Sequence, residues 1–289
     1  INNINIDNKI NYYSHPKLNQ KLTKEQYLTK IDVLKNHINR GDVYEANFCF
    51  EWFSEIAEID PLYVYQNLNR ISKSPMSVYF KHEELHLICS SPERYLKKNN
   101  NKLISQPIKG TSRRDNNNKI DQNLKSLLSN DPKERSENIM IVDLVRNDMS
   151  RFSKPGSVIV KELCEVYPFK QVHQMISTIE SEVESNLSIG KIIEGSFPMG
   201  SMTGAPKVKA MQIIDDLEES KRGLYSGAVG FIDPVGNFDF NVVIRSLIYD
   251  SVTKYLSFHV GSAITAKSKG ENEYEECLLK GKAMILSLT

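Results

Sequence analysis

The sequence predicts an α+β fold built on antiparallel sheets, because strand-like runs follow one another through short turns. The run from Met76 to Cys89 is interrupted by charged residues at 81–84, which is typical of a hairpin. Strands and helices do not alternate as they do in a Rossmann fold, and no internal repeat is present. Three further runs separated by turn-forming segments predict a β-meander, and they lie at 225–232, 238–249 and 255–260.

Helix beginnings are marked by capping residues and by proline at the first helical position. Thr23 and Gln26 form a capping box ahead of apolar residues at helical spacing. The helix that begins at Asp131-Pro132 is apolar almost all round, so we expect it to be buried. Together with a strand at 43–53, these signals predict helices at 23–41, from Asp60-Pro61 onward, at 131–149, at 206–219 and from about Asn272 onward.

The middle run of the meander predicts a strand with one partly polar face. Alternation places Asp239, Asn241, Val243 and Arg245 on one face and Phe238, Phe240, Val242, Ile244 and Ser246 on the other. An arginine on a partly polar strand face indicates a lined site. Arg245 is therefore a candidate binding residue.

The composition is typical of a globular protein and excludes several classes of function. The 289-residue chain has 37 basic and 36 acidic residues, and its net charge of +1 provides no electrostatic footprint for nucleic acid or an anionic membrane. The 4 cysteines form no C-x-x-C pair, which disfavours a zinc knuckle or a disulfide framework and favours a cytoplasmic location. No apolar run is long enough to span a bilayer, and the Asn-rich start is not a signal peptide. We expect an irregular lead-in at 1–22 and one catalytic domain at 23–289, and the lack of an initial Met indicates a piece of something longer.

Acidic residues on two predicted helices are candidate metal ligands. Glu273, Glu276 and Lys280 fall at i, i+3 and i+7, so they project from one face of the tail helix. A carboxylate pair suits Mg²⁺, although a solvated helix has the same charge pattern and spacing alone favours that interpretation. Glu137 lies near the start of the apolar helix, where a buried carboxylate requires a partner. A cation shared with the tail helix and the positive helix N-terminus would both satisfy it.

Two glycine-containing segments are candidate anion sites. Gly200 to Lys207 lacks the Walker spacing, so we reject nucleotide binding. Its amides suit another anion, while a tight start to the following helix would explain the same small residues. Gly261, Ser262 and Ala263 follow a predicted strand, where they either present amides to a carboxylate or turn the chain.

Six sequence blocks occur in a characteristic order along the chain. They are Ser91-Pro92-Glu93, Pro107-Ile108-Lys109-Gly110-Thr111, Glu137 to Asp148, Thr203-Gly204-Ala205-Pro206-Lys207, Tyr225 to Gly230 and Glu273-Tyr274-Glu275-Glu276. Together these blocks resemble the signature of the chorismate-utilising enzymes, which include anthranilate synthase component I, aminodeoxychorismate synthase component I and the isochorismate and salicylate synthases. The resemblance extends from about residue 24 to the end and implies packed antiparallel sheets flanked by helices, with the active site in a cleft between the sheet layers.

The block around Lys109 resembles one branch of this family. Aminodeoxychorismate synthases have a lysine at this position, whereas anthranilate synthases have an alanine. The resemblance therefore implies amination of chorismate, on the route to 4-aminobenzoate and folate. In the implied mechanism the Lys109 amine attacks carbon 2 as the carbon 4 hydroxyl leaves, and ammonia then attacks carbon 4 and expels the lysine. The attacking amine must be neutral, so we expect a depressed pKa for Lys109.

The same resemblance assigns roles to the other candidate residues. Glu93 matches the general acid that protonates the departing hydroxyl, which requires a raised pKa. Glu137, Glu273 and Glu276 match the ligands of a Mg²⁺ ion that bridges to the ring carboxylate of the substrate. Residues that match the carboxylate-binding or pocket-lining positions are Arg245, Tyr225, Lys280, Gly261, Ser262, Ala263, His173 and Thr203.

Some features depart from the family pattern or bear on partners. Many aminating members have Gln where this chain has Glu45, and water-adding members have a lysine base there, so water addition is disfavoured. Met199 lies where many family members have a glycine.

No Gly-x-Cys-x-Gly turn is present, so we expect ammonia from a separate glutamine amidotransferase subunit of the PabA type or from solution. The alternatives are anthranilate synthase component I, which Lys109 disfavours, and a non-catalytic subunit that only binds chorismate or an amidotransferase.

Overall fold

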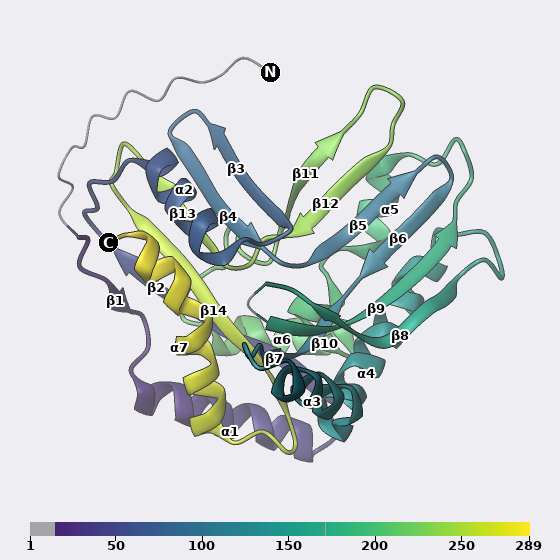
Figure 1. The fold of residues 1–289 in the computed structure, drawn as a ribbon, viewed down its shortest axis with the longest axis horizontal. Coiled ribbons are helices and arrows are strands. Elements are labelled where there is room, and N and C mark those ends of the chain that lie inside the picture. Colours follow the sequence, from purple (N-terminus) through teal and green to yellow (C-terminus); the bar gives the residue numbers. More distant parts are fainter. Residues whose placement is uncertain (1–14, 171) are drawn as a thin grey trace.

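Two antiparallel sheets form the body of the protein in the computed structural model, which describes residues 15–170 and 172–289 (Figure 1). Within these residues each sheet has 7 strands. The first, sheet A, has the order β1 (Asn19–Gln20), β2 (Glu45–Ser54), β14 (Leu256–Thr265), β13 (Ser246–Asp250), β4 (Leu85–Ser91) and β3 (Met76–His82), with β10 (Gly204–Ala205) paired to β2. The second, sheet B, has the order β11 (Ala228–Ile232), β12 (Phe238–Val242), β5 (Arg94–Asn99), β6 (Lys102–Gln106), β9 (Val172–Glu182) and β7 (Ile108–Arg113), with β8 (Ile159–Pro168) paired to β9.

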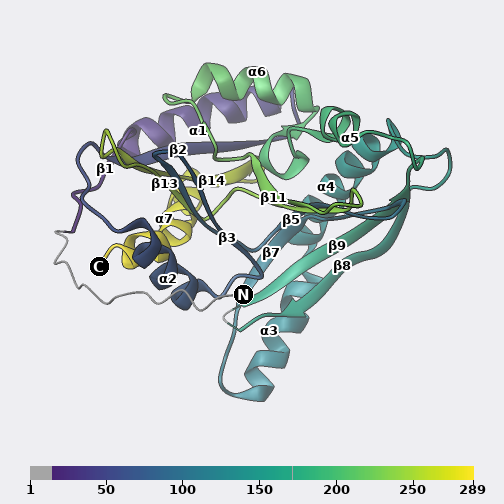
Figure 2. The same ribbon diagram turned by 90° about the horizontal axis from the view of Figure 1, so that it is seen from above.

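The helices divide between the two sheets, as Figure 2 shows from above. Sheet A is covered by α1 (Lys24–Asn39), α2 (Pro61–Ser72), α6 (Lys207–Leu217) and α7 (Gly270–Ser287). Sheet B is covered by α3 (Asn118–Asn130), α4 (Pro132–Ser150) and α5 (Ile189–Ser196), and a short 3₁₀ turn at Gly200–Met202 precedes β10. The predicted α+β fold with helices flanking antiparallel sheets is therefore confirmed.

Each sheet has its own hydrophobic core. Tyr27 of α1, Phe48 of β2 and Phe258 of β14 are fully buried beneath the helices of sheet A. Burial of one such side chain contributes roughly 1.5–3 kcal/mol. The core of sheet B lies beneath α4 and α5, and it also includes Cys49 from the opposite face of β2. The two sheets therefore pack against each other through a shared set of contacts.

The predicted helix beginnings are confirmed. Thr23 caps α1 in a reciprocal capping box, because its Oγ1 accepts from the Gln26 amide at 3.3 Å and its own amide donates to Gln26 Oε1 at 2.8 Å. Asp60 caps α2, which begins at Pro61, and the predicted hairpin forms β3 and β4. Of the predicted lead-in at 1–22, residues 1–14 lie outside the described residues, and Asn19–Gln20 pairs with β2.

The prediction that the helix at 131–149 is buried holds for only one of its faces. One face of α4 is buried, with Ile141 and Val142 at 1% and 2% exposure, while Ile139 is 39% exposed. The helix lies on the surface of sheet B, so only the residues that face the sheet lose contact with water. The charged residues Asp143 and Arg146 occupy the outer face and pair with each other.

The prediction of one strand at 238–249 is also wrong, and the predicted meander fails with it. β12 ends at Val242 in sheet B, and β13 begins at Ser246 in sheet A. Between them Arg245 has a φ of 53°, in the left-handed region that ends regular strand geometry. The predicted alternation therefore breaks down, and adjacent Asn241, Val242 and Val243 are all buried.

Candidate active site

Glu93 and Arg245 lie where the chain crosses from one sheet to the other. Pro92 and Glu93 connect β4 of sheet A to β5 of sheet B, and residues 243–245 connect β12 of sheet B to β13 of sheet A. The Val242 amide donates to the Glu93 carbonyl at 3.1 Å, and the Ser90 amide donates to the Arg245 carbonyl at 3.2 Å. The two crossings are therefore held side by side, and they place a carboxyl group and a guanidinium group at the junction of the sheets.

Lys109 bridges the same junction. Its Nζ on β7 lies 3.1 Å from Glu45 Oε1 on β2, and the two side chains are 13% and 1% exposed. Burial lowers the pKa of Lys109, but the attraction of Glu45, Glu137 and Glu93 outweighs burial and holds the pKa above its ordinary value. The expected depressed pKa is therefore not found, because three carboxylates surround the amine. Pairing these carboxylates with other cations would remove the attraction that keeps the proton on Lys109.

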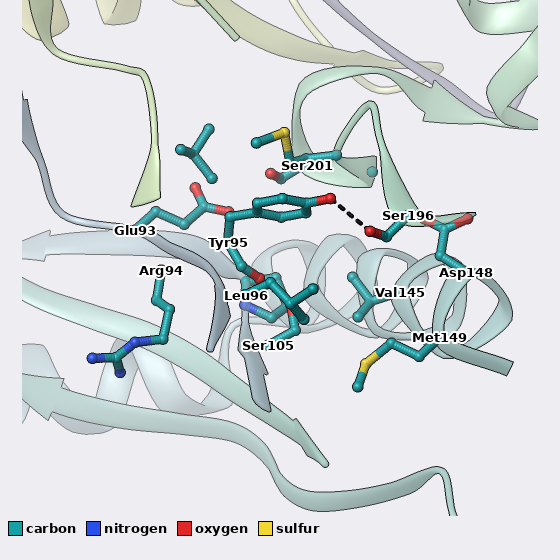
Figure 3. A pocket seen from close by; sticks show the side chains of 14 residues that line it. Glu93, Arg94, Tyr95, Leu96, Ser105, Val145, Asp148, Met149, Ser196 and Ser201 are labelled. Atoms are coloured by element: carbon teal, nitrogen blue, oxygen red, sulfur yellow. Dashed lines mark hydrogen bonds between the residues drawn. The ribbon is translucent and has the colours of Figure 1, made fainter. Parts of the chain in front are cut away.

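Glu93 has the character of an acid near neutral pH. The residue is 6% exposed, and burial raises its pKa to about 7 against the opposing effects of a hydrogen bond from Ser201 and of the Lys109 charge. Figure 3 shows the Glu93 carboxyl and Ser201 on the same side of the lining of a cavity. A substantial fraction of Glu93 is thus protonated at pH 7, as proton donation to a leaving group requires.

This cavity lies behind Glu93 and has a volume of about 30 Å³. Farther inside, the Tyr95 hydroxyl lies 2.6 Å from Ser196 Oγ, as Figure 3 shows. Asp148, which also lines the cavity, pairs with Lys207 at 2.5 Å. The volume corresponds to about one water molecule, whereas substrate pockets hold roughly 300–1,000 Å³. The cavity is therefore not the predicted substrate cleft. The Lys207–Asp148 pair instead joins two of the signature blocks behind the site.

Carboxylates from α4 and α7 face a common cation. Burial raises the pKa of Glu137 to about 7, and its Oε1 is buried without a hydrogen-bond partner. Burial lowers the pKa of Lys133, but Glu137 and Glu273 are the strongest of four acidic groups that raise it above its usual value. Glu276 pairs with Lys280 at 2.6 Å. The structure therefore brings the acidic ends of the two helices toward one another.

The carboxylates of α4 and α7 suit a hard divalent cation, but they do not form a complete set of protein ligands for it. Carboxylate oxygens are the ligands that Mg²⁺ prefers, and the buried Oε1 of Glu137 has no hydrogen-bond partner, although Lys133 Nζ lies 3.7 Å from it. Across residues 15–170 and 172–289, no group of 3 or more acidic, His or Cys side chains is arranged as a metal site. The donors thus suit an ion held by one or two carboxylates, with water or an anionic substrate in the remaining positions.

Arg245 and Tyr225 lie together beside this acidic region. Burial lowers the pKa of the Arg245 guanidinium, whereas Tyr225 and Glu276 act in the opposite direction. Among the residues that the structure describes, none forms an ion pair with Arg245. Tyr225 is buried, and its ring stacks on His259 with centroids 5.1 Å apart. The guanidinium is thus available to a substrate carboxylate.

The segment Gly261 to Ala263 lies inside β14, so it does not turn the chain. Lys280 Nζ donates to the Gly261 carbonyl at 2.9 Å, on the side of β14 where pairing with β13 has ended at Ser257. In an antiparallel strand the N–H and C=O of one residue point to the same side. The amides of Gly261 and Ala263 therefore face this open edge, whereas the Ser262 amide faces β2. The Ser262 hydroxyl lies 3.4 Å from the Tyr27 hydroxyl.

His173 and Thr203 make structural contacts. His173 Nε2 lies 3.0 Å from Asp121 Oδ1, which also accepts from Arg114. The Thr203 hydroxyl donates to the Met199 carbonyl at 3.0 Å. The structure does not link either residue to Lys109 or Glu93, and their contact with substrate stays a prediction.

Two residues that contact the candidate catalytic groups were not assigned a role from the sequence. Glu45 pairs with Lys109, and Ser201 donates a hydrogen bond to Glu93. A signal for Glu45 was present, because alternation along β2 places Glu45, Asn47 and Glu51 on the face opposite the hydrophobic core. Ser201 lies in the 3₁₀ turn, where periodicity carries no such signal.

A largely buried lysine, a buried acid and an arginine without an ion-pair partner among the described residues lie together at the junction of two antiparallel sheets, an arrangement typical of an enzyme active site. The chain belongs to the family of chorismate binding enzymes, whose sequence pattern matches residues 6–286. Over 264 residues it is 40% identical to the probable aminodeoxychorismate synthase, chloroplastic, of Oryza sativa subsp. japonica. The aligned region covers 90% of this chain and 29% of that protein.

Two further relatives are similar to most of the chain. Aminodeoxychorismate synthase component 1 of Escherichia coli (strain K12) is 35% identical over 267 residues, 92% of this chain and 58% of that protein. The crystal structure of anthranilate synthase component I from Streptococcus pneumoniae TIGR4 superposes with a TM-score of 0.85 at 28% identity, over 94% of this chain and 60% of that chain. The chain thus spans less than two thirds of each of these relatives. Among the described helices none has the length and apolarity of a membrane span.

Proposed function

We propose that this chain is the catalytic region of an aminodeoxychorismate synthase, which converts chorismate and ammonia to 4-amino-4-deoxychorismate. The observation that carries the proposal is the buried Lys109 amine at the junction of the sheets, 3.1 Å from Glu45 and within the electrostatic reach of Glu93. The similarity to proteins named aminodeoxychorismate synthase supports the same reaction. A buried lysine that can lose its proton is a suitable nucleophile.

The proposed chemistry has two displacements that share one ring. In the first, the neutral Lys109 amine forms a bond to carbon 2, the ring double bonds shift, and the bond from carbon 4 to its hydroxyl oxygen breaks. Glu93 gives its proton to that oxygen, so water leaves. In the second, ammonia forms a bond to carbon 4, the double bonds shift back, and the bond between carbon 2 and Lys109 breaks. A proton from the attacking nitrogen returns to Glu93, which restores the acid.

The remaining residues bind and orient the substrate. Arg245 can hold the ring carboxylate with two parallel hydrogen bonds, and Tyr225, Lys280 and the β14 edge at 261–263 lie near it. The proposed ligands of a Mg²⁺ ion are Glu137, Glu273 and Glu276, with the ion held by one or two of them at a time. When bound, this ion supplies positive charge that offsets the substrate carboxylate and the surrounding acids.

We also propose that a separate glutamine amidotransferase subunit supplies the ammonia and that the enzyme is cytoplasmic. All four cysteines of the chain, at 49, 89, 164 and 277, are buried free thiols, so none is placed as an accessible glutaminase nucleophile. Unpaired thiols are typical of a reducing compartment.

Product analysis of the purified chain tests this function. With chorismate, Mg²⁺ and an ammonium salt, we expect 4-amino-4-deoxychorismate in mass spectra, and we expect Lys109→Ala to abolish its formation. Lys97→Ala is the matched control, because Lys97 lies on sheet B with a 41% exposed side chain and should retain activity. Release of anthranilate and pyruvate would instead identify an anthranilate synthase. A lack of turnover both with and without a glutaminase subunit would identify a non-catalytic chorismate-binding subunit.

A further inference from the structure

Arg222 lies in the loop that connects α6 to β11, and its guanidinium is largely buried. The side chain is 16% exposed and pairs with Glu218, which is 7% exposed. Its Nη2 and Nε donate to the two oxygens of Glu218 at 2.7 and 2.9 Å. The other N–H groups donate to the Met202 carbonyl at 2.7 Å, the Asn47 carbonyl at 2.8 Å and the Ser226 hydroxyl at 3.3 Å. Because arginine has five N–H donors, every donor of this guanidinium has an acceptor.

The Arg222–Glu218 ion pair closes a gap along one edge of β2. That edge pairs with β10 at 45–46 and with β1 at 52–53. Between these two stretches the Asn47 carbonyl accepts from Arg222, and the Cys49 amide donates to Glu218 at 3.0 Å. Satisfying the backbone of this edge explains these two contacts. It does not require the contacts of the guanidinium with the 3₁₀ turn and with the loop before β11.

Through Met202 the guanidinium holds the 3₁₀ turn that supports the candidate acid. Ser201 directly precedes Met202 and donates a hydrogen bond to Glu93. Through Asn47 the guanidinium holds the stretch of β2 that carries Glu45, the partner of the candidate nucleophile. A shift of either segment would move a group that contacts one of the two candidate catalytic residues.

The third acceptor, Ser226, connects the guanidinium to the residues proposed to bind the substrate carboxylate. Ser226 follows Tyr225, and its amide donates to the Val243 carbonyl at 2.9 Å in the crossing that carries Arg245. Its φ of 67° lies in the left-handed region, which is costly for serine and persists where the surroundings hold the residue there. The hydrogen bond from Arg222 to the Ser226 hydroxyl is one such restraint.

On the basis of the proposed function of this site, we infer that Arg222, held in place by Glu218, is a positioning residue that fixes the 3₁₀ turn, β2 and the loop before β11 relative to one another around the substrate. Hydrogen bonds from a charged donor are stronger than those between neutral groups, and a guanidinium presents them in a rigid fork. Arg222 thus acts on the reaction through the residues that its acceptors hold. A displacement of about 1 Å in such residues lowers a rate by roughly 100-fold.

Steady-state kinetics on Arg222→Lys test this role. Lysine keeps a positive charge beside Glu218, but its donors lie on one nitrogen and cannot reach acceptors on several sides. With Mg²⁺ and an ammonium salt, we expect kcat for chorismate consumption to fall at least about tenfold and the KM for chorismate to rise at least about fivefold. A loss of folded molecules alone would lower the apparent kcat and leave the KM unchanged.

Lys30→Met is the matched control. Lys30 of α1 fastens the same end of α6 from the opposite side, because its ammonium donates to the Leu217 carbonyl at 2.6 Å and pairs with Glu219 at 2.7 Å. Its side chain is 20% exposed, similar to that of Arg222. This variant should lower the Tm while it retains the wild-type KM and the wild-type kcat per folded molecule.

The double variant Glu218→Met/Arg222→Met removes the ion pair without leaving a buried charge. Replacement of a buried ion pair by apolar residues of similar volume is often neutral or stabilising, so we expect a cooperative unfolding transition. Its kcat should nevertheless fall and its KM for chorismate should rise at least as much as in Arg222→Lys. This variant decides the question if Arg222→Lys does not fold. Failure of both variants to fold would assign the pair to the stability of the fold alone and overturn the inference.

The outcomes separate the role of Arg222 from the proposed function. A wild-type KM for chorismate in folded Arg222→Lys or in the folded double variant would refute the positioning role, and so would equal changes in Lys30→Met. If wild-type protein consumes chorismate without forming 4-amino-4-deoxychorismate, the proposed function fails, and the kinetics of chorismate consumption still test Arg222. If wild-type protein consumes no chorismate, the rise in Tm with chorismate concentration replaces the KM, and Arg222→Lys should require at least about fivefold more chorismate for the same rise.

Discussion

Removal of the Lys109 charge should destabilise the folded protein as well as abolish amination. The Lys109–Glu45 pair is 13% and 1% exposed, so Lys109→Met leaves Glu45 as a buried charge without its cation. Breaking such a buried pair costs about 3–5 kcal/mol. For a chain of this size we expect the Tm to fall by roughly 10 °C. Glu45→Gln removes the uncompensated charge, so the double variant Lys109→Met/Glu45→Gln should recover most of the loss.

Thermal and urea unfolding of the two single variants and the double variant form a double-mutant cycle. We expect a coupling free energy of about 2–3 kcal/mol, since each partner is costly only when the other is absent. Lys97→Met is the control, because the Lys97 side chain is 41% exposed and its ammonium lies 3.9 Å from Asp239, so it should change stability by less than about 0.5 kcal/mol. Additive effects of Lys109→Met and Glu45→Gln would show that the two residues are not coupled, and the geometry assigned to the site would then be incorrect.

Three further predictions concern the other site residues. Because the folded pKa of Glu93 is raised to about 7, the native state binds more protons than the unfolded state between pH ~4.5 and ~7. Urea unfolding should therefore show stability falling as pH rises through this window, and Glu137, whose pKa is also raised to about 7, contributes in the same direction. Glu93→Gln should make the slope less steep, and an unchanged slope would contradict the raised pKa of Glu93. Arg245→Lys should raise the KM for chorismate about tenfold or more with a smaller effect on kcat, through loss of bidentate binding, and an unchanged KM would exclude carboxylate binding there. Glu137→Gln should abolish the Mg²⁺-induced rise in Tm while Glu134→Gln retains it, and a preserved rise in Glu137→Gln would remove Glu137 from the ion site.

The sequence predicted the elements whose local signals are complete within a few residues. The Thr23 capping box and the Asp60-Pro61 helix start are each determined by neighbours within one turn. The α4 helix was placed correctly but its burial was not, because its apolar residues extend around the helix and only contact with sheet B selects the buried face. Local pattern thus determined element type, and long-range packing determined exposure.

The Lys109 partner could not be predicted from periodicity. Glu45 lies 64 residues from Lys109 in the chain, and the two strands that carry them belong to different sheets. Strand alternation places each side chain on a face, but it does not specify which faces meet. Lys109 itself was identified through the family resemblance, and the electrostatic consequence of its surroundings, a raised pKa, required the three-dimensional arrangement of Glu45, Glu137 and Glu93.

The error at 238–249 coincides with a functional position. Strand alternation was extended through Arg245, whereas the chain leaves sheet B there through a left-handed residue and enters sheet A. A continuous strand would place Arg245 in one sheet, and only the crossing places it beside Glu93, which lies in the reverse crossing from sheet A to sheet B. Groups that must converge on one ligand from two sheets are found where the chain passes between those sheets. Since regular periodicity ends at such crossings, a break in an otherwise good strand pattern that contains an arginine or a glutamate is itself a signal of the site.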